Sequence, residues 1–198
     1  MASKYRNSGQ TCICANRFYV QSGIYDAFVD RLAKSVATLH IGDGLILGVN
    51  QGPLIDAKAL ARMKAQVADA VAKGGRLVCG GRPHALGGNF FEPTIIAQAT
   101  AAMAFAREEI FGPLAPVFRF ETEAEAIAAA NNTEYGLAAY CYTRDLGRAF
   151  RVSEALEYGM GAGCLLYAAG TAKLTELGGL ASRLPLVMLT LHCYSECA

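Results

Sequence analysis

The stretch APVFRFETEAEAIAAANNTEYGLAAYCYT, residues 115–143, carries the pattern that decides the fold. It begins with a run of strand-forming residues, after which Thr122 and Glu125 form a capping box for a helix that runs through Ala130. A turn follows, and a second run of strand formers fills residues 137–143. A helix between two strands is the unit from which parallel sheets are built. The stretch therefore predicts an α/β fold.

The same alternation of strand and helix extends on both sides of this stretch. We expect strands or extended segments at residues 17–21, 77–79 and 90–96, and helices over residues 24–39, 56–73 and 146–158. Polar residues that can cap these helices stand at their starts, namely Ser22, Asp56 and Asp145. In the second helix the predicted apolar face consists of Leu60, Met63, Val67 and Val71. The whole pattern predicts a mostly parallel sheet with flanking helices.

Composition excludes several classes of function. The 198 residues are 53% apolar and 18% charged, with a formal net charge of +1, so a sizeable core can form and nothing favours nucleic acid as a partner. The longest strongly apolar run, residues 184–191, is too short to span a bilayer, so we expect no membrane partner. The first residues contain no apolar segment typical of a secretory leader.

The cysteines and histidines indicate free thiols rather than a metal site. Seven cysteines are an odd number and lie mostly in apolar runs, which fits reduced thiols in a reducing compartment such as the cytoplasm. Cys12 and Cys14 are separated by one residue, no second pair follows at zinc-finger spacing, and the chain has only three histidines. We therefore expect no metal.

A second stretch near the start, RNSGQTCIC at residues 6–14, carries the chemistry. Small, polar and Gly-containing residues lead into Cys12, and Arg6 stands six places upstream. A loop of this kind can expose a thiol, and a nearby positive charge lowers the pKa of a thiol and favours the reactive thiolate. Considered alone, this pattern is compatible with either a nucleophile or an inert small residue.

Several motifs in order give the chain a resemblance to a known family. KYRN before SGQTC, then REEIFGPLAPV at residues 107–117 and NNTEYGLAAYCYTRD at residues 131–145, resemble the catalytic domain of aldehyde dehydrogenases, and within them the succinate-semialdehyde branch. NQGPLID at residues 50–56 and NFFEPTII at residues 89–96 are also similar to that family. The resemblance runs from Met1 to about Gly159.

The resemblance implies an NAD- or NADP-dependent oxidation of a small semialdehyde. Cys12 matches the nucleophile, and Arg6 matches an arginine that pairs with the distal carboxylate of the substrate. Glu109 matches the acid that hydrogen-bonds the nicotinamide ribose, and Phe111 matches a ring beside the nicotinamide. Cys14 matches a residue that in some members forms a reversible disulfide with the nucleophile. The family also implies a homo-oligomer.

Each of these residues also has a structural interpretation. Arg6 could be a surface cation, Glu109 a solvated carboxylate at a turn, and Phe111 a core side chain. Cys14 could be a buried thiol, because one intervening residue strains a disulfide with Cys12 unless the loop moves.

The chain departs from the family at both ends. We expect the dinucleotide-binding domain, together with the general base, to be absent, because the family places it before the nucleophile. We expect residues 1–158 to form a partial catalytic domain and residues 159–198 a divergent tail, in which no regular element is assigned and a change of reading frame is one explanation. Without the family's last strand, oligomer formation is in question for this chain. The alternative to an enzyme is therefore an inactive fragment, at most a binding or redox-thiol module.

Overall fold

The computed structural model defines residues 1–166 and 187–190. The longer elements follow one another along the chain in this order: α1 (Ala2–Tyr5), η1 (Arg6–Gly9), β1 (Arg17–Gln21), α2 (Tyr25–Val36), α3 (Ala57–Ala72), β2 (Arg76–Cys79), β3 (Thr94–Ala99), β4 (Leu114–Phe120), α4 (Glu123–Asn131), β5 (Ala138–Thr143), α5 (Leu146–Ala155), β6 (Met160–Leu166) and β7 (Val187–Thr190). Two short 3₁₀ turns, η2 (Ser22–Ile24) and η3 (Ala104–Ala106), lie between them.

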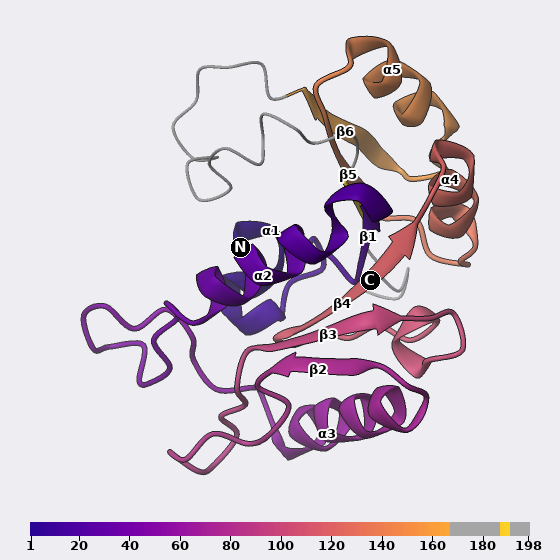
Figure 1. Ribbon diagram of the computed structural model, residues 1–198. Coiled ribbons are helices and arrows are strands. Elements are labelled where there is room, and N and C mark those ends of the chain that lie inside the picture. The colour runs from indigo at the N-terminus through magenta and orange to yellow at the C-terminus, as the bar shows by residue number, and fades with distance from the viewer. Residues whose placement is uncertain (167–186, 191–198) are drawn as a thin grey trace.

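The seven strands form one sheet in the order β2-β3-β4-β1-β7-β5-β6 (Figure 1). Parallel pairing joins β3 to β4, β4 to β1 and β5 to β6. β7 is antiparallel to both of its neighbours, β1 and β5, so these two share one direction. β2 is antiparallel to β3 at the edge. Among the described strands, β2 and β7 oppose the common direction, and the predicted α/β fold with a mostly parallel sheet and flanking helices is confirmed.

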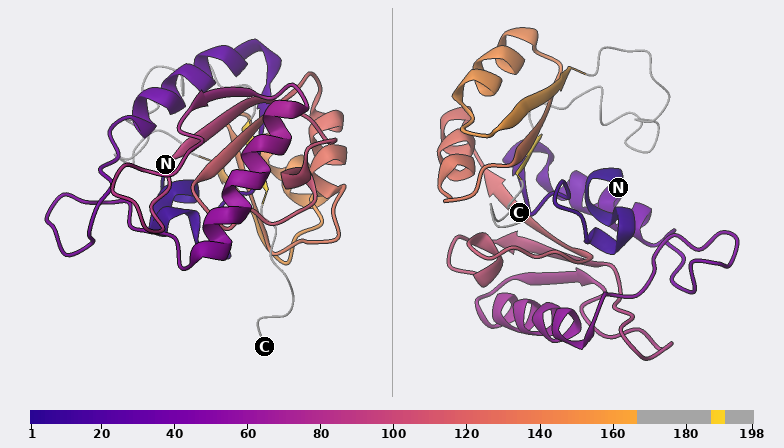
Figure 2. Two further views of the ribbon diagram at one scale, coloured as in Figure 1. Left: turned by 90° about the horizontal axis from the view of Figure 1, so that it is seen from below. Right: turned by 180° about the vertical axis from the view of Figure 1, so that it is seen from behind.

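Helices cover both faces of the sheet because side chains alternate along each strand. In β1, Phe18 and Val20 point into the cluster of buried side chains that also contains the apolar stripe of α2. Tyr19 points the other way, where α3, α4 and α5 contribute to the second cluster and where its ring packs 5.1 Å from that of Phe118. In Figure 2 the sheet lies between α2 and the layer that contains α3.

The structure confirms three of the four helix caps predicted from the sequence. The side chains of Asp56, Thr122 and Asp145 each accept a hydrogen bond from the backbone N–H three residues on, at 2.7, 3.2 and 2.9 Å. The cap predicted at Ser22 is wrong. The chain passes through η2 before α2 begins, the side chain of Ser22 makes no cap, and its hydroxyl donates to Glu121.

The predicted apolar face of α3 needs one correction. Met63 and Val67 are buried as expected, but Val71 is 49% exposed, and Ala70 takes its place against the sheet. The helix turns 100° per residue, so the side chain that meets the sheet in the last turn is the one three residues after Val67, not four.

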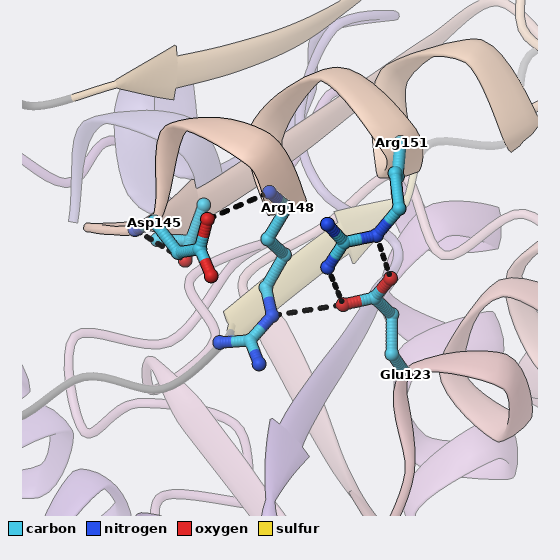
Figure 3. A network of polar contacts seen from close by, with 5 residues as sticks. Glu123, Asp145, Arg148 and Arg151 are labelled. Atoms are coloured by element: carbon cyan, nitrogen blue, oxygen red, sulfur yellow. Dashed lines mark hydrogen bonds and ion pairs between the residues drawn. The ribbon is translucent and has the colours of Figure 1, made fainter.

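A carboxylate joins α4 to α5 on the surface (Figure 3). Glu123 accepts from Arg148 Nε at 2.8 Å through one oxygen and from Arg151 Nε at 3.1 Å through the other. These two hydrogen-bonded ion pairs lower the pKa of Glu123 below its ordinary value, the contact with Arg151 contributing most. The two helices that flank the β5 end of the sheet are therefore linked through one side chain.

Two strands occur beyond Gly159, where the sequence assigns no element. β6 extends the sheet beside β5, and β7 is inserted between β1 and β5. The predictions made for the rest of the tail, residues 167–186 and 191–198, lie outside the described residues.

Candidate active site

The loop that carries Cys12 has an unusual backbone. Asn7, Ser8 and Gly9 have φ values of 50°, 55° and 75°, all in the left-handed region. Glycine adopts this region freely and asparagine often does, but a serine there is strained by about 1–3 kcal/mol. Such a conformation persists only where neighbouring contacts impose it.

Contacts from the loop after α2 hold this backbone in place. The Ser8 hydroxyl donates to the carbonyl of Gly52 at 2.9 Å. The Gln10 amide donates to the carbonyl of Pro53 at 3.2 Å, and its oxygen accepts from the N–H of Ile55 at 2.8 Å. The sequence showed this loop as Gly-rich and irregular. It did not show that the loop clamps the segment before Cys12.

The two cysteines of the loop have different environments. Cys12 is exposed, whereas Cys14 is buried. The Cys14 sulfur lies 2.6 Å from the Thr11 hydroxyl and donates to the Arg6 carbonyl at 3.7 Å. Both thiols are free in this structure, and the side chain of Arg6 is exposed. The loop therefore presents one accessible thiol and keeps the other buried.

The segment with Glu109 and Phe111 is attached to the Cys12 loop. A Cβ atom at Gly9 would collide with the carbonyl oxygen of Gly112, so the two backbones touch there. The Asn16 side chain accepts from the N–H of Ile110 at 2.8 Å and donates to the carbonyl of Glu108 at 3.2 Å. Residues almost 100 positions apart in the chain are thus fixed side by side.

Phe111 and Glu109 are both half-buried in this segment. Phe111 has a φ of 44°, which is strained for an aromatic residue. Burial raises the pKa of Glu109, and the charges of Arg62 and Lys4 oppose that rise. Gln66 donates to the Glu109 carbonyl at 3.4 Å, so α3 supports this segment from below. A carboxylate held in this way can accept hydrogen bonds from hydroxyl groups of a ligand.

Three charged or polar neighbours of the site were not found from the sequence. They are Lys4, Arg62 and Tyr140. Tyr140 donates to the carbonyl of Ile13 at 3.2 Å, and its pKa is raised by burial first and by Cys14 second. Lys4 and Tyr140 lie in the motifs KYRN and NNTEYGLAAYCYTRD, where no role was predicted for them, and Arg62 lies outside the motifs. Only the packing of the fold brings them there.

A metal centre and a membrane-spanning helix are both absent from the part of the chain that the structure defines. Within residues 1–166 and 187–190, three or more His, Cys, Asp or Glu side chains nowhere gather as they would around a metal ion. No helix in that part is long and apolar enough to cross a membrane. A groove of about 590 Å³ lies along α2, lined by Met1, Arg31, Lys34, Ser35, Thr38, Leu39 and Asn50, and includes none of the residues predicted for the site.

Comparison with known proteins supplies the wider context. The sequence profile described as "Aldehyde dehydrogenase family" matches residues 1–179. The chain is 62% identical over 160 residues to a glutarate-semialdehyde dehydrogenase of Pseudomonas aeruginosa, and 61% identical over 160 residues to the succinate-semialdehyde dehydrogenase [NADP(+)] GabD of Escherichia coli. Each match covers 81% of this chain and 33% of the relative. This chain therefore spans about a third of the length of these relatives.

A solved structure matches the fold as well. The crystal structure of an E. coli NADP-dependent enzyme superimposes with a TM-score of 0.79 at 61% identity. That match covers 80% of this chain and 33% of the other.

Proposed function

This chain belongs to the aldehyde dehydrogenase family, and on that premise we propose that it carries the nucleophile of a dehydrogenase for short semialdehydes, succinate semialdehyde in particular. The observation that supports the proposal most is the position of Cys12. Its thiol is exposed at the end of a backbone turn that is held in the left-handed region and attached to the Glu109 segment. A fixed, accessible thiol is what covalent catalysis on an aldehyde needs.

In the proposed reaction Cys12 acts as a thiolate. Its sulfur bonds to the aldehyde carbon, and the carbonyl π electrons move to oxygen, which gives an oxyanion that the backbone N–H of Cys12 would stabilise. The oxygen then re-forms the C=O bond as the aldehyde hydrogen leaves carbon as hydride, for which a bound nicotinamide cofactor, NAD or NADP, would supply the acceptor. Water cleaves the thioester that remains on Cys12, which releases the acid and restores the thiolate.

The remaining predicted residues bind rather than react. Arg6, exposed on the same loop, would pair with the distal carboxylate of the semialdehyde through its two-pronged guanidinium. The half-buried Glu109 would accept hydrogen bonds from the cofactor ribose, and Phe111 would pack beside the nicotinamide ring. The residues present fit this part of a cofactor site, because the charges of Arg62 and Lys4 oppose the rise that burial causes in the pKa of Glu109.

Cys12 and Cys14 support a second, regulatory candidate. One is exposed and the other is buried two residues further along the same loop, and a disulfide between them would remove the nucleophile reversibly. The free thiols of the described residues also support a reducing location, and we propose the cytoplasm. A homo-oligomer remains a proposal taken from the family.

Alkylation of the chain with iodoacetamide tests the nucleophile without requiring turnover. We expect one thiol to react much faster than the others, Cys12→Ser to remove that fast phase, and Cys79→Ser to leave it unchanged as the matched control. Succinate semialdehyde should slow the fast phase because the thiohemiacetal blocks the sulfur. Equal reactivity of Cys12 and Cys79 would contradict the proposal.

The role of Arg6 has its own control. Protection by succinate semialdehyde should weaken about 10-fold or more in Arg6→Gln, since a charge-assisted pair contributes about 1.5–3 kcal/mol. Protection by butanal, which has no carboxylate, should be unchanged. Equal loss for both aldehydes would assign Arg6 to the loop's structure instead.

A turnover assay separates an enzyme from a fragment. The chain is incubated with NAD or NADP and succinate semialdehyde, and the absorbance of the reduced cofactor is followed. Because the chain spans a third of its relatives, we expect no turnover by these 198 residues alone. Steady reduction of either cofactor would show that the site is complete.

A further inference from the structure

Cys12 lies in a turn that begins at Thr11 and ends at Cys14. The N–H of Cys14 donates to the carbonyl of Thr11 at 2.9 Å, which closes the turn around Cys12 and Ile13. The Thr11 hydroxyl also lies 2.6 Å from the Cys14 sulfur, so backbone and side chains join the same two residues. The direction in which the exposed thiol points therefore depends on how this turn is oriented.

A tyrosine from a distant part of the chain binds the end of this turn. Tyr140 donates its hydroxyl to the carbonyl of Ile13 at 3.2 Å, across 127 positions of the sequence. Among the described residues, no other hydrogen bond reaches the turn from outside residues 1–16. Tyr140 thus provides the described hydrogen bond between the turn and the sheet.

The peptide unit between Ile13 and Cys14 is bound on both sides. Its carbonyl accepts from Tyr140, and its N–H donates to Thr11. Because a peptide unit is planar, partners for both of its polar groups fix the direction of its plane. Cys12 comes directly before Ile13, so the turn that carries its thiol is held in one orientation.

Tyr140 itself is held by the fold. It lies in the middle of β5, which pairs with β6 on one side and with β7 on the other. Its partly buried ring packs, as Ile13 does, against the cluster of buried side chains that contains the apolar stripe of α2. Burial is the main cause that raises the pKa of Tyr140, so at neutral pH the hydroxyl keeps the proton that it donates. An interior strand therefore presents a fixed donor to the turn.

We propose that Tyr140 is a positioning residue for the proposed reaction, because its hydroxyl orients the turn from which Cys12 attacks the aldehyde. The inference rests on the proposed function for the role of Cys12. Addition to a carbonyl needs the sulfur at a defined distance and direction from the carbon, whereas alkylation by a small reagent needs an accessible thiolate. Loss of the Tyr140 hydroxyl should therefore weaken aldehyde addition more than alkylation.

Labelling of two buried thiols measures whether the turn opens. Tyr140→Phe keeps the ring and removes only the hydroxyl, and iodoacetamide labelling of Cys14 and Cys141 is followed by mass spectrometry. Both thiols are buried, at 7% and 1% exposure, but Cys141 belongs to β5 and reports opening of the sheet. We expect the Cys14 rate to rise about 3- to 10-fold relative to the Cys141 rate, as for the loss of one neutral hydrogen bond.

Tyr142→Phe is the matched control for this ratio. Tyr142 lies on the same face of β5, two residues further on, and its hydroxyl hydrogen-bonds the Ser3 side chain instead of the turn. The control should leave the ratio of the two labelling rates unchanged. An unchanged ratio in Tyr140→Phe, whether both thiols stay protected or both are labelled together, would overturn the proposal.

Protection of Cys12 by aldehydes tests the proposed step itself. In Tyr140→Phe, protection by succinate semialdehyde and by butanal should weaken alike, about 3- to 10-fold, while alkylation without aldehyde stays within about 2-fold. The equal loss distinguishes Tyr140 from Arg6, whose substitution should affect only the aldehyde that has a carboxylate. Unchanged protection, or an equal loss of the alkylation rate, would refute the positioning role.

The labelling ratio involves neither aldehyde nor cofactor. If the ratio rises in Tyr140→Phe but aldehydes do not protect Cys12 in the unmodified chain, the proposed function is refuted, while the contact between Tyr140 and the turn stands. If aldehydes protect Cys12 to the same extent with and without the Tyr140 hydroxyl, only the role of Tyr140 is refuted.

Discussion

Gly9 is the residue at which the two segments of the candidate site meet. Its φ is 75°, and a Cβ atom there would strike the backbone of Gly112, which cannot swing aside as a side chain can. Gly9→Ala should therefore lower the free energy of unfolding by about 3 kcal/mol or more, the sum of left-handed strain and a backbone clash.

Urea denaturation followed by circular dichroism measures this effect. Gly23→Ala is the matched control, because no atom lies within 4 Å of its Cβ position and its backbone lies outside the left-handed region. Equal stability of the two variants would mean that the segments do not touch at Gly9.

Arg17 is a buried cation that belongs to the fold rather than to the site. It is 2% exposed and donates to the carbonyls of Ala129 and Ala130, at 3.1 and 2.8 Å, and to the hydroxyl of Tyr158 at 3.1 Å. The two carbonyls belong to the last turn of α4, where a positive charge is favourable. Arg17→Met removes the charge and its three hydrogen bonds and leaves only the Tyr19 and Tyr158 hydroxyls as donors to the two carbonyls, so it should cost about 3 kcal/mol.

Tyr158→Phe is the variant with which the loss of stability in Arg17→Met is compared. It removes one hydroxyl but leaves the guanidinium on the helix end, so we expect a loss of about 1 kcal/mol in the same urea measurement. A smaller loss for Arg17→Met than for Tyr158→Phe would show that the helix carbonyls do not depend on Arg17.

The residues of the candidate site differ in how far the sequence could predict them. Cys12, Arg6 and Glu109 lie in ordered motifs, so a resemblance could suggest the roles proposed for them. Lys4 and Tyr140 also lie in motifs, KYRN and NNTEYGLAAYCYTRD, but the resemblance assigned them no role. Their packing against segments far away in the chain depends on the fold, which no local pattern records.

At the scale of elements, Glu123 links α4 to α5 and should make stability depend on pH. Its two arginine partners hold its pKa below the ordinary value, so the unfolded chain binds its proton more readily than the folded one. The stabilisation is complete at pH values above the unfolded pKa and is lost as the pH falls through the folded pKa, that is, below about pH 4. Glu123→Gln should cost roughly 0.5–1 kcal/mol at pH 7, since the group is partly exposed.

The comparison at two pH values isolates this carboxylate. At pH 3 the difference in unfolding free energy between Glu123→Gln and the unmodified chain should shrink toward zero. Glu154→Gln, an exposed position on the same helix α5, should show little difference at either pH. A cost for Glu123→Gln that persists undiminished at pH 3 would point to packing instead of charge.

Helices whose first turn is capped by a side chain close by in the sequence were predicted well. Asp56, Thr122 and Asp145 start their helices as expected, because an acceptor side chain three residues before a free N–H needs nothing from the rest of the fold. Ser22 failed because a distant carboxylate, Glu121, takes its hydroxyl. The antiparallel direction of β2 could not be predicted from its own residues either. It depends on pairing with β3, which follows β2 after a Gly-rich connection.

At the scale of the whole molecule, β7 determines whether the sheet is continuous. Its residues come from the part of the chain in which the sequence assigns no element, yet the strand is paired on both sides. Met188 stands opposite Tyr19 of β1 and Cys141 of β5. The two halves of the sheet, β2-β3-β4-β1 and β5-β6, are therefore joined through β7.

A proline in β7 tests this arrangement. Met188→Pro removes a backbone donor from the middle of an interior strand, so we expect a loss of roughly 2–4 kcal/mol in unfolding free energy and faster proteolysis. Met188→Val keeps the donor and a strand-compatible side chain and should stay within about 1.5 kcal/mol of the unmodified chain. If both variants unfold at the same urea concentration, the strand does not join the sheet in solution. The backbone groups of β1 and β5 that face β7 would then need other hydrogen-bond partners, because unpaired strand edges buried from water are costly.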